Sequence, residues 1–246
     1  MLVPEKVTTT LDALGLSSNS GVRYQVNEYN SWRRQVKQLK RIKPLRSYGQ
    51  FGEDAMLQGL LPSTPGFYID IGSGHPIIGS NTYALYELGW RGILVDPVRA
   101  NVELSQRVRP GDNSIHAAIG LSDSDVIDFT EFDTYQYPTT SESRVAEVSA
   151  LGHKVTARYA VKILRLEQIL PTEIPAGSSV MSIDVEGEEM GVLLSNDWEI
   201  FRPDFMLIED LTPPMRRSTS VSEFLISKNY ELIGIAGVTC LYKRLD

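Results

Sequence analysis

The chain has 246 residues, 42% of them hydrophobic and 22% charged, which is enough to build a sizeable core of ordinary globular composition. Its net charge of −7 argues against a general nucleic-acid binder, and its one cysteine, Cys240, excludes an intrachain disulfide framework and a Cys-rich zinc site. We see neither a secretory signal nor an apolar run long enough to span a bilayer, so we expect a soluble, cytoplasmic protein without a membrane span.

Residues 1–47 are predicted to form an N-terminal helical extension. Between 21 and 42, hydrophobic residues recur at three- and four-residue spacings, which is the period of an amphipathic helix. The opposite face is basic, with Arg33, Arg34 and Lys37 among its members. We favour a solvated charged face on a packed helix; a cationic patch for an acidic substrate or partner is the alternative.

Residues 48–54, YGQFGED, combine glycines, an amide and two acids just before a short helix that ends near Leu61. One interpretation is a helix N-terminus whose dipole is complemented by Glu53 and Asp54. The other, slightly favoured, is a loop that covers a cofactor and brings Gln50 to it.

The most informative stretch is 66–97. Residues 67–71 form an apolar run bounded by glycines, typical of a strand covered on both faces. Gly72, Ser73 and Gly74 permit a tight turn. A helix capped near Asn81 then leads to a second buried strand that ends at Asp96. A glycine turn after one strand and an acid after the next form a nucleoside-binding layout, in which the acid accepts hydrogen bonds from ribose hydroxyls.

The glycine pattern indicates which cofactor binds. A dinucleotide fingerprint needs a third glycine where this chain has Ile77. The pattern D-x-G-x-G, formed by Asp70, Gly72 and Gly74, instead resembles motif I of the class I S-adenosylmethionine-dependent methyltransferases. An acid at this place can serve the ammonium group of the methionine moiety.

The rest of the chain alternates strands and helices, which predicts a parallel sheet. A β-excursion is expected at 123–132, an irregular substrate-facing cover at 135–159, and a C-terminal β-hairpin at 230–243. The other predicted elements are helices at 98–108, 189–194 and 220–228, strands at 114–119, 158–164, 180–184 and 203–209, and a helical turn at 166–170.

Four motifs together resemble the FkbM family of methyltransferases. They are YGQFGED at 48–54, the run at 66–97, RPGDNSIHAAI from 109, and IDVEGEE at 183–189. The resemblance implies a Rossmann-like class I methyltransferase fold over 48–246, with a mostly parallel seven-stranded sheet, an antiparallel C-terminal hairpin and helices on both faces. It also implies O-methylation of a hydroxyl on a sugar, glycan, glycolipid or natural product, so the partner is a small-molecule or glycan acceptor.

The resemblance assigns the cofactor site residue by residue. Gln50, Asp70 and the turn Gly72, Ser73 and Gly74 line the methionine end of S-adenosylmethionine. Ser80 and Asn81 bind its carboxylate, and Asp96 holds the ribose. Asp112 and Ala117 are the expected neighbours of the adenine.

Three acids are the candidate catalytic residues: Asp184, Glu186 and Glu209 follow or end buried strands. Open α/β sheets bind their ligands at this edge. The acids can remove the proton of an acceptor hydroxyl, or they can hold Mg²⁺, which is not predicted but stays open. Two alternatives from other classes are a nicotinamide-dependent oxidoreductase and a non-catalytic nucleoside-binding protein.

Overall fold

The computed structural model describes residues 31, 33, 34, 37, 46–134, 139–210 and 219–246. The chain divides into two units, Met1–Leu45 and Arg46–Asp246. In the first unit, Ser31, Arg33, Arg34 and Lys37 are helical, and the rest of the helix predicted at 21–42 lies outside the described residues. The second unit contains the strands and the predicted site residues.

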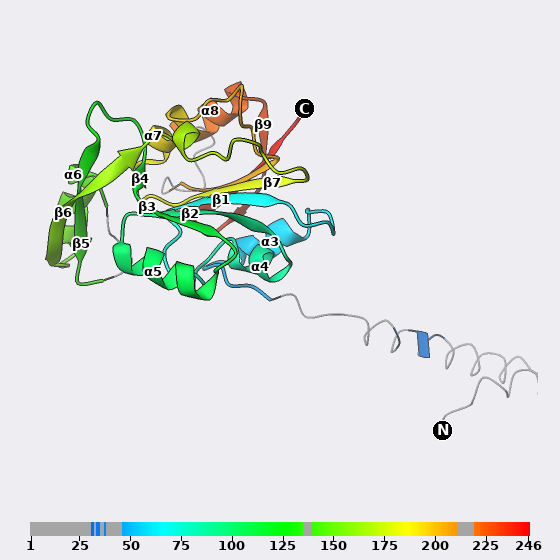
Figure 1. Ribbon diagram of the computed structural model, residues 1–246. Helices are drawn as coiled ribbons and strands as arrows, with labels where there is room; N and C mark the ends of the chain where they lie inside the picture. The colour runs from blue at the N-terminus through cyan, green and yellow to red at the C-terminus, as the bar shows by residue number, and fades with distance from the viewer. Residues whose placement is uncertain (1–30, 32, 35–36, 38–45, 135–138, 211–218) are drawn as a thin grey trace, which may run out of the picture. The chain divides into compact units, whose positions relative to one another are not determined.

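The centre of this unit is a seven-stranded sheet with the strand order β3-β2-β1-β7-β8-β10-β9 (Figure 1). Neighbouring strands are parallel from β3 to β8, and β10 is antiparallel to both β8 and β9. This confirms the predicted sheet and its C-terminal hairpin. The strands are β1 Phe67–Ile71, β2 Arg91–Asp96, β3 Asn113–His116, β7 Ser179–Ile183, β8 Phe205–Glu209, β9 Tyr230–Ala236 and β10 Thr239–Arg244.

Helices cover both faces of this sheet, as expected. Figure 1 shows α3, α4 and α5 on one side of the strands and α7 and α8 on the other. Their bounds are α3 Glu53–Gln58, α4 Tyr83–Glu87, α5 Arg99–Val108, α7 Glu189–Leu194 and α8 Ser220–Ser227. The capping box of α8 is formed by Thr219 and Ser222, one residue earlier than the predicted start of the pattern at Ser220.

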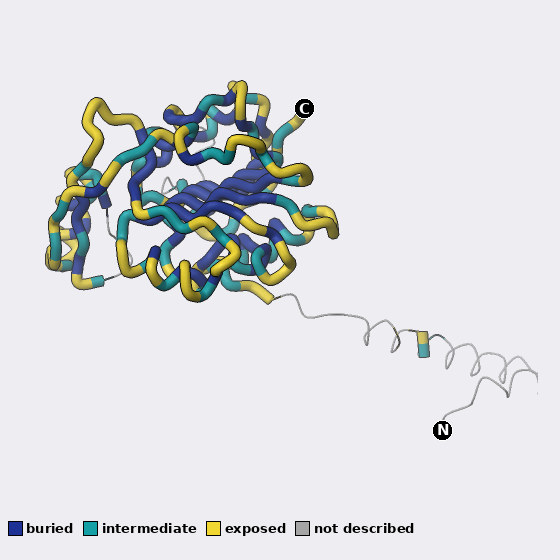
Figure 2. Tube along the Cα trace, in the orientation of Figure 1, coloured by how far each residue is buried: buried dark blue, intermediate teal, exposed yellow. Residues whose placement is uncertain are grey.

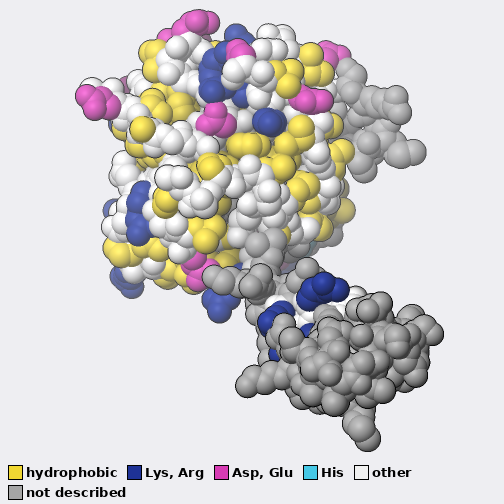
Figure 3. Space-filling model, turned by 90° about the vertical axis from the view of Figure 1, so that its right-hand side faces the viewer, with side chains coloured by type: hydrophobic (Ala, Val, Ile, Leu, Met, Phe, Trp, Pro, Cys, Tyr) yellow, Lys and Arg dark blue, Asp and Glu magenta, His cyan; other side chains and the backbone are white. Residues whose placement is uncertain are grey.

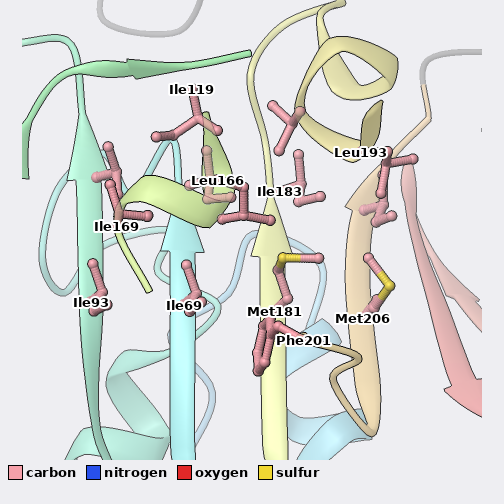
Figure 4. Close-up of a cluster of buried hydrophobic side chains, with 14 of the residues drawn as sticks. Ile69, Ile93, Ile119, Leu166, Ile169, Met181, Ile183, Leu193, Phe201 and Met206 are labelled. Atoms are coloured by element: carbon pink, nitrogen blue, oxygen red, sulfur yellow. The ribbon is translucent and has the colours of Figure 1, made fainter. Parts of the chain in front are cut away.

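The core consists of two hydrophobic layers separated by the sheet. Successive side chains of a strand point to opposite faces, so Ile69 joins the α7 and α8 side while Tyr68 joins the α3 and α4 side. Figure 4 shows the first layer, in which Ile69, Met181 and Met206 from three neighbouring strands lie side by side. Because both faces are covered, the central strands are buried along their whole length, as Figure 2 shows.

An insertion between β3 and β7 forms a second, smaller sheet in the order β4-β6-β5, at the left in Figure 1. Its strands are β4 Ala118–Ile119, β5 Val126–Phe132 and β6 Val155–Leu164, and β6 leads into the 3-10 turn η2 Leu166–Gln168. The helix α6 Glu142–Ala150 lies between β5 and β6 in the sequence and packs Val145 and Val148 against Phe132.

Two predictions for this region were wrong. The strand predicted at 114–119 is two strands in different sheets: β3 pairs with β2 up to His116, whereas Ala118 pairs with Ile163 of β6. Its apolar pattern does not change at Ala117, so it gave no sign that the pairing partner changes. The stretch 135–159 is also more regular than predicted, because it contains α6 and the start of β6; residues 135–138 of it lie outside the described residues.

Charges on the outer surface are mixed. On the face shown in Figure 3, acidic and basic side chains of the described residues are interspersed rather than gathered by sign. Within the described part of the chain, no helix has the length and apolar character needed to cross a bilayer.

Beneath the turn that follows β1, a buried arginine joins three segments of the chain. The side chain of Arg109, which directly follows α5, is completely buried, and its Nε donates to Oδ2 of Asp112 at 2.8 Å. Its Nη2 donates both to the Tyr68 hydroxyl at 2.7 Å and to Oγ1 of Thr82 at 3.0 Å. Thr82 in turn donates to Asp70 at 2.5 Å. One cation thus connects β1, the start of α4 and the turn before β3.

Replacing Arg109 with methionine should therefore destabilise the protein strongly. The substitution leaves the buried carboxylate of Asp112 without its cation, and breaking a buried pair in this way costs about 3–5 kcal/mol. Arg107→Met, on an exposed position of the same helix, is the matched control and should change stability by roughly 0.5 kcal/mol or less. Urea denaturation of both variants measures the difference; equal midpoints would contradict the structural role of Arg109.

Candidate active site

The predicted site residues gather at the carboxyl edge of the main sheet. The chain builds β1, β2 and β3 outward in one direction and then returns to place β7 on the other side of β1. Ligands of open α/β sheets bind outside the strand ends at such a reversal point. Gly72 follows β1, Asp96 ends β2, Asp184 follows β7 and Glu209 ends β8.

The glycine turn needs both of its glycines. Gly72 has a φ of +75°, and a Cβ there would lie 1.7 Å from the backbone oxygen of Asp184, so β1 and β7 approach too closely for any side chain. The amides of Gly72 and Ser73 both donate to the Val95 carbonyl, which ties the turn to β2. Gly74 has a φ of +55°, and a Cβ there would meet nothing within 4 Å, so the turn faces open space.

Asp96 is held in place and keeps capacity for a further hydrogen bond. Its Oδ2 accepts from the Gly74 amide at 2.7 Å, and its Oδ1 accepts from the Val98 amide at 2.8 Å and from Nδ2 of Asn101 at 3.2 Å. Burial raises the pKa of Asp96 to about 6, although these donors act in the opposite direction. A carboxylate offers about four acceptor positions, so one remains for a hydroxyl such as that of a ribose.

Asp70 and Ser80, both expected at the methionine end, make hydrogen bonds inside the protein. Asp70 is buried, and its oxygen accepts from Thr82; burial raises its pKa, partly offset by Arg109. Ser80 is also buried, and its hydroxyl accepts from the amides of Thr82 and Tyr83. The Ser80 hydroxyl thus supports the start of α4 as an acceptor, and its contact with the methionine carboxylate stays a prediction.

The side-chain amide of Asn81 has one atom with a partner and one without. Its Nδ2 donates to Oγ of Ser182 at 3.2 Å, and its buried Oδ1 has no hydrogen-bond partner. A buried polar atom without a partner is costly, so this oxygen needs a donor. This oxygen can accept from an ammonium group, and the carboxylate contact that the resemblance assigned to Asn81 stays a prediction.

The expected adenine contact of Asp112 is corrected. Its side chain is completely buried, one oxygen bound by Arg109 and Tyr68 and the other by the Gly92 amide. Ala117 is buried between β3 and β4, and its amide donates to the Asp96 carbonyl, which keeps it near the end of β2.

The loop of 48–54 folds back on itself through its acids. The carboxylate of Glu53 accepts from the amides of Gln50 and Phe51, and that of Asp54 accepts from the Tyr48 amide. Gln50 itself is exposed. The charge of Glu53 contributes to the raised pKa of Asp184, so this loop lies near the acidic residues of the site.

Asp184, Glu186 and Glu209 come together as predicted, and we call them the acid cluster. One carboxylate oxygen from each lies within 4.8 Å of the others. Asp184 is exposed, and the other two are half-buried. The backbone of Glu186 has a φ of +54°, a left-handed conformation that costs a non-glycine residue about 1–2 kcal/mol. Strain of this kind is concentrated at functional sites.

The acid cluster holds protons unusually strongly. Burial, followed by the charge of Asp184, raises the pKa of Glu186 to about 7. Burial and the charges of its two neighbours raise the pKa of Glu209 further, and its carboxyl hydrogen-bonds that of Asp184. This contact favours the protonated form of Glu209 and the ionised form of Asp184. One oxygen of Glu209 is buried and has no hydrogen-bond partner.

The insertion contributes residues that sequence reasoning missed. Arg144 of α6 donates from its Nη2 to Oε2 of Glu186 at 3.2 Å, and Oγ1 of Thr139 lies 3.4 Å from the Glu186 carbonyl oxygen. Arg144 is 42 positions before Glu186, and no motif or periodicity relates the two. Only the packing of the insertion brings them together.

Comparisons with known proteins agree with this geometry. A family model described as Methyltransferase FkbM domain matches residues 70–231. No curated protein matched the chain by sequence. Among solved structures, similar chains include a TehB-like SAM-dependent methyltransferase from Corynebacterium glutamicum, at 10% identity, a TM-score of 0.41 and coverage of 90% of this chain and 100% of that one. A putative RNA methyltransferase from Pyrococcus horikoshii follows, at 11% identity, a TM-score of 0.42 and coverage of 79% and 83%.

The family match carries the assignment, because it extends over residues 70–231 of the 246 and includes the glycine turn, Asp96 and the acid cluster. The sheet order and the C-terminal hairpin are those expected for that family. The chain therefore belongs to the FkbM family of methyltransferases, for which S-adenosylmethionine is the implied methyl donor.

Proposed function

We propose that the protein is an O-methyltransferase that methylates a hydroxyl of a sugar, a glycan or a small natural product. The observation that carries this proposal is the acid cluster, because it lies beside the glycine turn and presents an exposed carboxylate at the carboxyl edge of the sheet. A hydroxyl is a weak nucleophile until a base removes its proton, and a carboxylate near the methyl donor can do this.

The residues at the edge fit S-adenosylmethionine. Asp96 has an acceptor position for the ribose, the space beside Gly74 is open, and the unpartnered oxygen of Asn81 suits the ammonium group. When bound, S-adenosylmethionine supplies a methyl group on a positively charged sulfur. The task of this chain is to hold an acceptor hydroxyl next to that group and to take its proton.

Within the acid cluster we assign the base to Asp184. Its pKa, raised to about 6 mainly by desolvation of the carboxyl, makes it a stronger base than an ordinary aspartate while it stays ionised at neutral pH. The contact with Glu209 favours the ionised form of Asp184, which is the form that can accept a proton. Glu186, the third member of the cluster, is held by Arg144.

A divalent cation is the alternative partner of the cluster. Three carboxylates with oxygens within 4.8 Å of one another offer hard ligands of the kind that Mg²⁺ prefers. We favour the base, because Arg144 already supplies a positive charge at Glu186 and because the raised pKa values of Glu186 and Glu209 favour protonated over ionised carboxyls.

Asp184→Asn should abolish turnover without weakening the binding of S-adenosylmethionine. The amide keeps the shape of the side chain but loses its basicity, and general-base assistance is typically worth about 10²–10⁴-fold. Calorimetry measures donor binding, and transfer of a labelled methyl group to a panel of sugars and hydroxylated natural products measures turnover. Glu188→Gln, in the same loop, is the matched control. Turnover by Asp184→Asn at the wild-type rate would rule out both the base and the metal.

Chelation and pH separate the two roles of Asp184. If Asp184 is a base, EDTA leaves turnover unchanged, and the rate rises with pH through about 6 and then levels off, because only the deprotonated carboxylate accepts the proton. Loss of activity in EDTA with recovery in added Mg²⁺ would show that the cluster acts through a cation instead.

Asp96→Ala should weaken the binding of S-adenosylmethionine by about tenfold or more. A hydrogen bond to a charged group contributes about 1.5–3 kcal/mol, and each 1.4 kcal/mol is a factor of ten in affinity. Because Asp96 also accepts from Gly74 and Val98, melting temperatures must accompany the calorimetry. Asn101→Ala removes one donor but keeps the carboxylate, and it serves as the control. An unchanged dissociation constant in Asp96→Ala would show that another group holds the ribose.

The acid cluster should also lower the free energy of unfolding at alkaline pH. The pKa of Glu209 is raised by folding, so the folded state keeps a proton that the unfolded state has released, and stability falls as pH rises above about 4.3 towards the folded pKa. Glu209→Gln cannot ionise. It should melt higher than wild type at pH 8, by roughly 2–4 °C for each kcal/mol gained, and close to wild type at pH 5. Glu231→Gln, at an exposed position, should show no such difference between the two pH values. If the melting temperature of Glu209→Gln differed from that of wild type by the same amount at both pH values, the raised pKa of Glu209 would not be the cause.

A further inference from the structure

We infer that Arg144, on the insertion, is a positioning residue for the catalytic acid cluster. This inference rests on the proposed O-methyltransferase function. Nη2 of Arg144 bonds Oε2 of Glu186 at 3.2 Å, while its Nη1 bonds Oε2 of Glu147 at 3.1 Å on the same helix. The side chains of Arg144 and Glu186 are only 19% and 17% exposed, so solvent screens this pair less than it screens a surface pair.

The loop that carries Glu186 needs an external support. Glu186 has a φ of +54° and Gly187 a φ of +107°, so two successive residues have left-handed backbones between the end of β7 and the start of α7. Such conformations persist when the surrounding structure holds them in place. Two contacts from the insertion reach this point: Arg144 holds the Glu186 side chain, and Thr139 lies against its carbonyl oxygen.

The support is itself firmly attached. Thr139 is buried and exchanges two backbone hydrogen bonds with Thr130 of β5, at 2.9 and 3.0 Å. Directly after Arg144, Val145 begins the contact of α6 with the hydrophobic side chain of Phe132. Arg144 therefore projects from a part of the insertion that is anchored on both sides of it, and it can define where Glu186 lies.

The ion pair between Arg144 and Glu186 also changes the net charge of the acid cluster. Asp184, Glu186 and Glu209 place three acidic groups close together, and repulsion between the ionised members favours moving them apart. Arg144 neutralises part of this charge at Glu186, which lets the cluster stay compact beside the glycine turn. Loss of Arg144 should therefore affect the step that the cluster performs and not the binding of S-adenosylmethionine, whose proposed residues lie on β2 and in the segments after β1 and before α4.

The test compares Arg144→Met with Arg144→Lys and Arg158→Met. Arg158 of β6 pairs with Glu142 of α6, the helix that carries Arg144. The side chains of this pair are 51% and 74% exposed, and the pair does not include a residue of the acid cluster, so Arg158→Met is the matched control. Hydrogen exchange of the amides at 184–189 reports the position of the loop without any acceptor. Calorimetry with S-adenosylmethionine and labelled methyl transfer to the acceptor panel report binding and turnover.

We expect faster exchange at 184–189 in Arg144→Met, a fall in kcat of about tenfold or more, as for loss of a hydrogen bond to a charged group, and an unchanged dissociation constant for S-adenosylmethionine. Arg144→Lys should recover part of the loss, because lysine keeps the charge but not the forked donor geometry. Arg158→Met should match wild type in all three measurements.

The outcomes separate failure of this inference from failure of the proposed function. Exchange at 184–189 that is the same in Arg144→Met and Arg158→Met would overturn the positioning role. Faster exchange with unchanged turnover would show that Arg144 holds the loop but that the loop is not catalytic, which overturns the function proposed for the acids. If Arg144→Met does not fold, Arg144→Lys against Arg158→Lys gives the same comparison.

Discussion

The structure depends on one buried cation. Arg109 lies beneath the glycine turn and holds Asp112 directly and Asp70 through Thr82, so two carboxylates remain in the interior close to a compensating charge. The same guanidinium lies 5.3 Å from the ring centre of Tyr68 and 5.4 Å from that of Tyr86. These contacts fix β1, which leads into the glycine turn, relative to the start of α4. The cofactor edge is thus supported from within the core.

Acids in this protein have opposite roles according to their surroundings. Asp112 is completely buried, beside a cation that is equally buried, and its task is structural. Among the described residues, the three carboxylates of the acid cluster have one arginine contact, at Glu186, and the pKa of each member is raised. Groups kept in such an unfavourable state are typical of sites that must accept or release protons. Position alone, at the end of a strand, does not distinguish the two kinds of acid.

Much of the fold was predictable because buried parallel strands leave a strong signature. β1, β2, β7 and β8 are short apolar runs that end at glycines or acids, and the acid cluster was found from those strand ends. The hydrogen bonds of Asp112 were not predictable, since two of its partners, Tyr68 and Gly92, come from distant segments. The helix α6 was missed for a similar reason: its two buried valines are too few to mark a hydrophobic face in a stretch rich in Ser, Thr and Glu.

The way in which the insertion joins the main sheet has an evolutionary consequence. The chain leaves at β4 and returns at the end of β6, and these two ends pair with each other, Ala118 with Ile163 and Ile119 with Leu164. The exit and the return are therefore adjacent, and the segment between them can lengthen, shorten or be exchanged at a loop-closure cost that grows only slowly with its length. Acceptor preference can diversify through this segment while the strands that carry the cofactor edge keep their register. Variation in such a lineage is limited mainly by the need to keep a cation opposite Glu186.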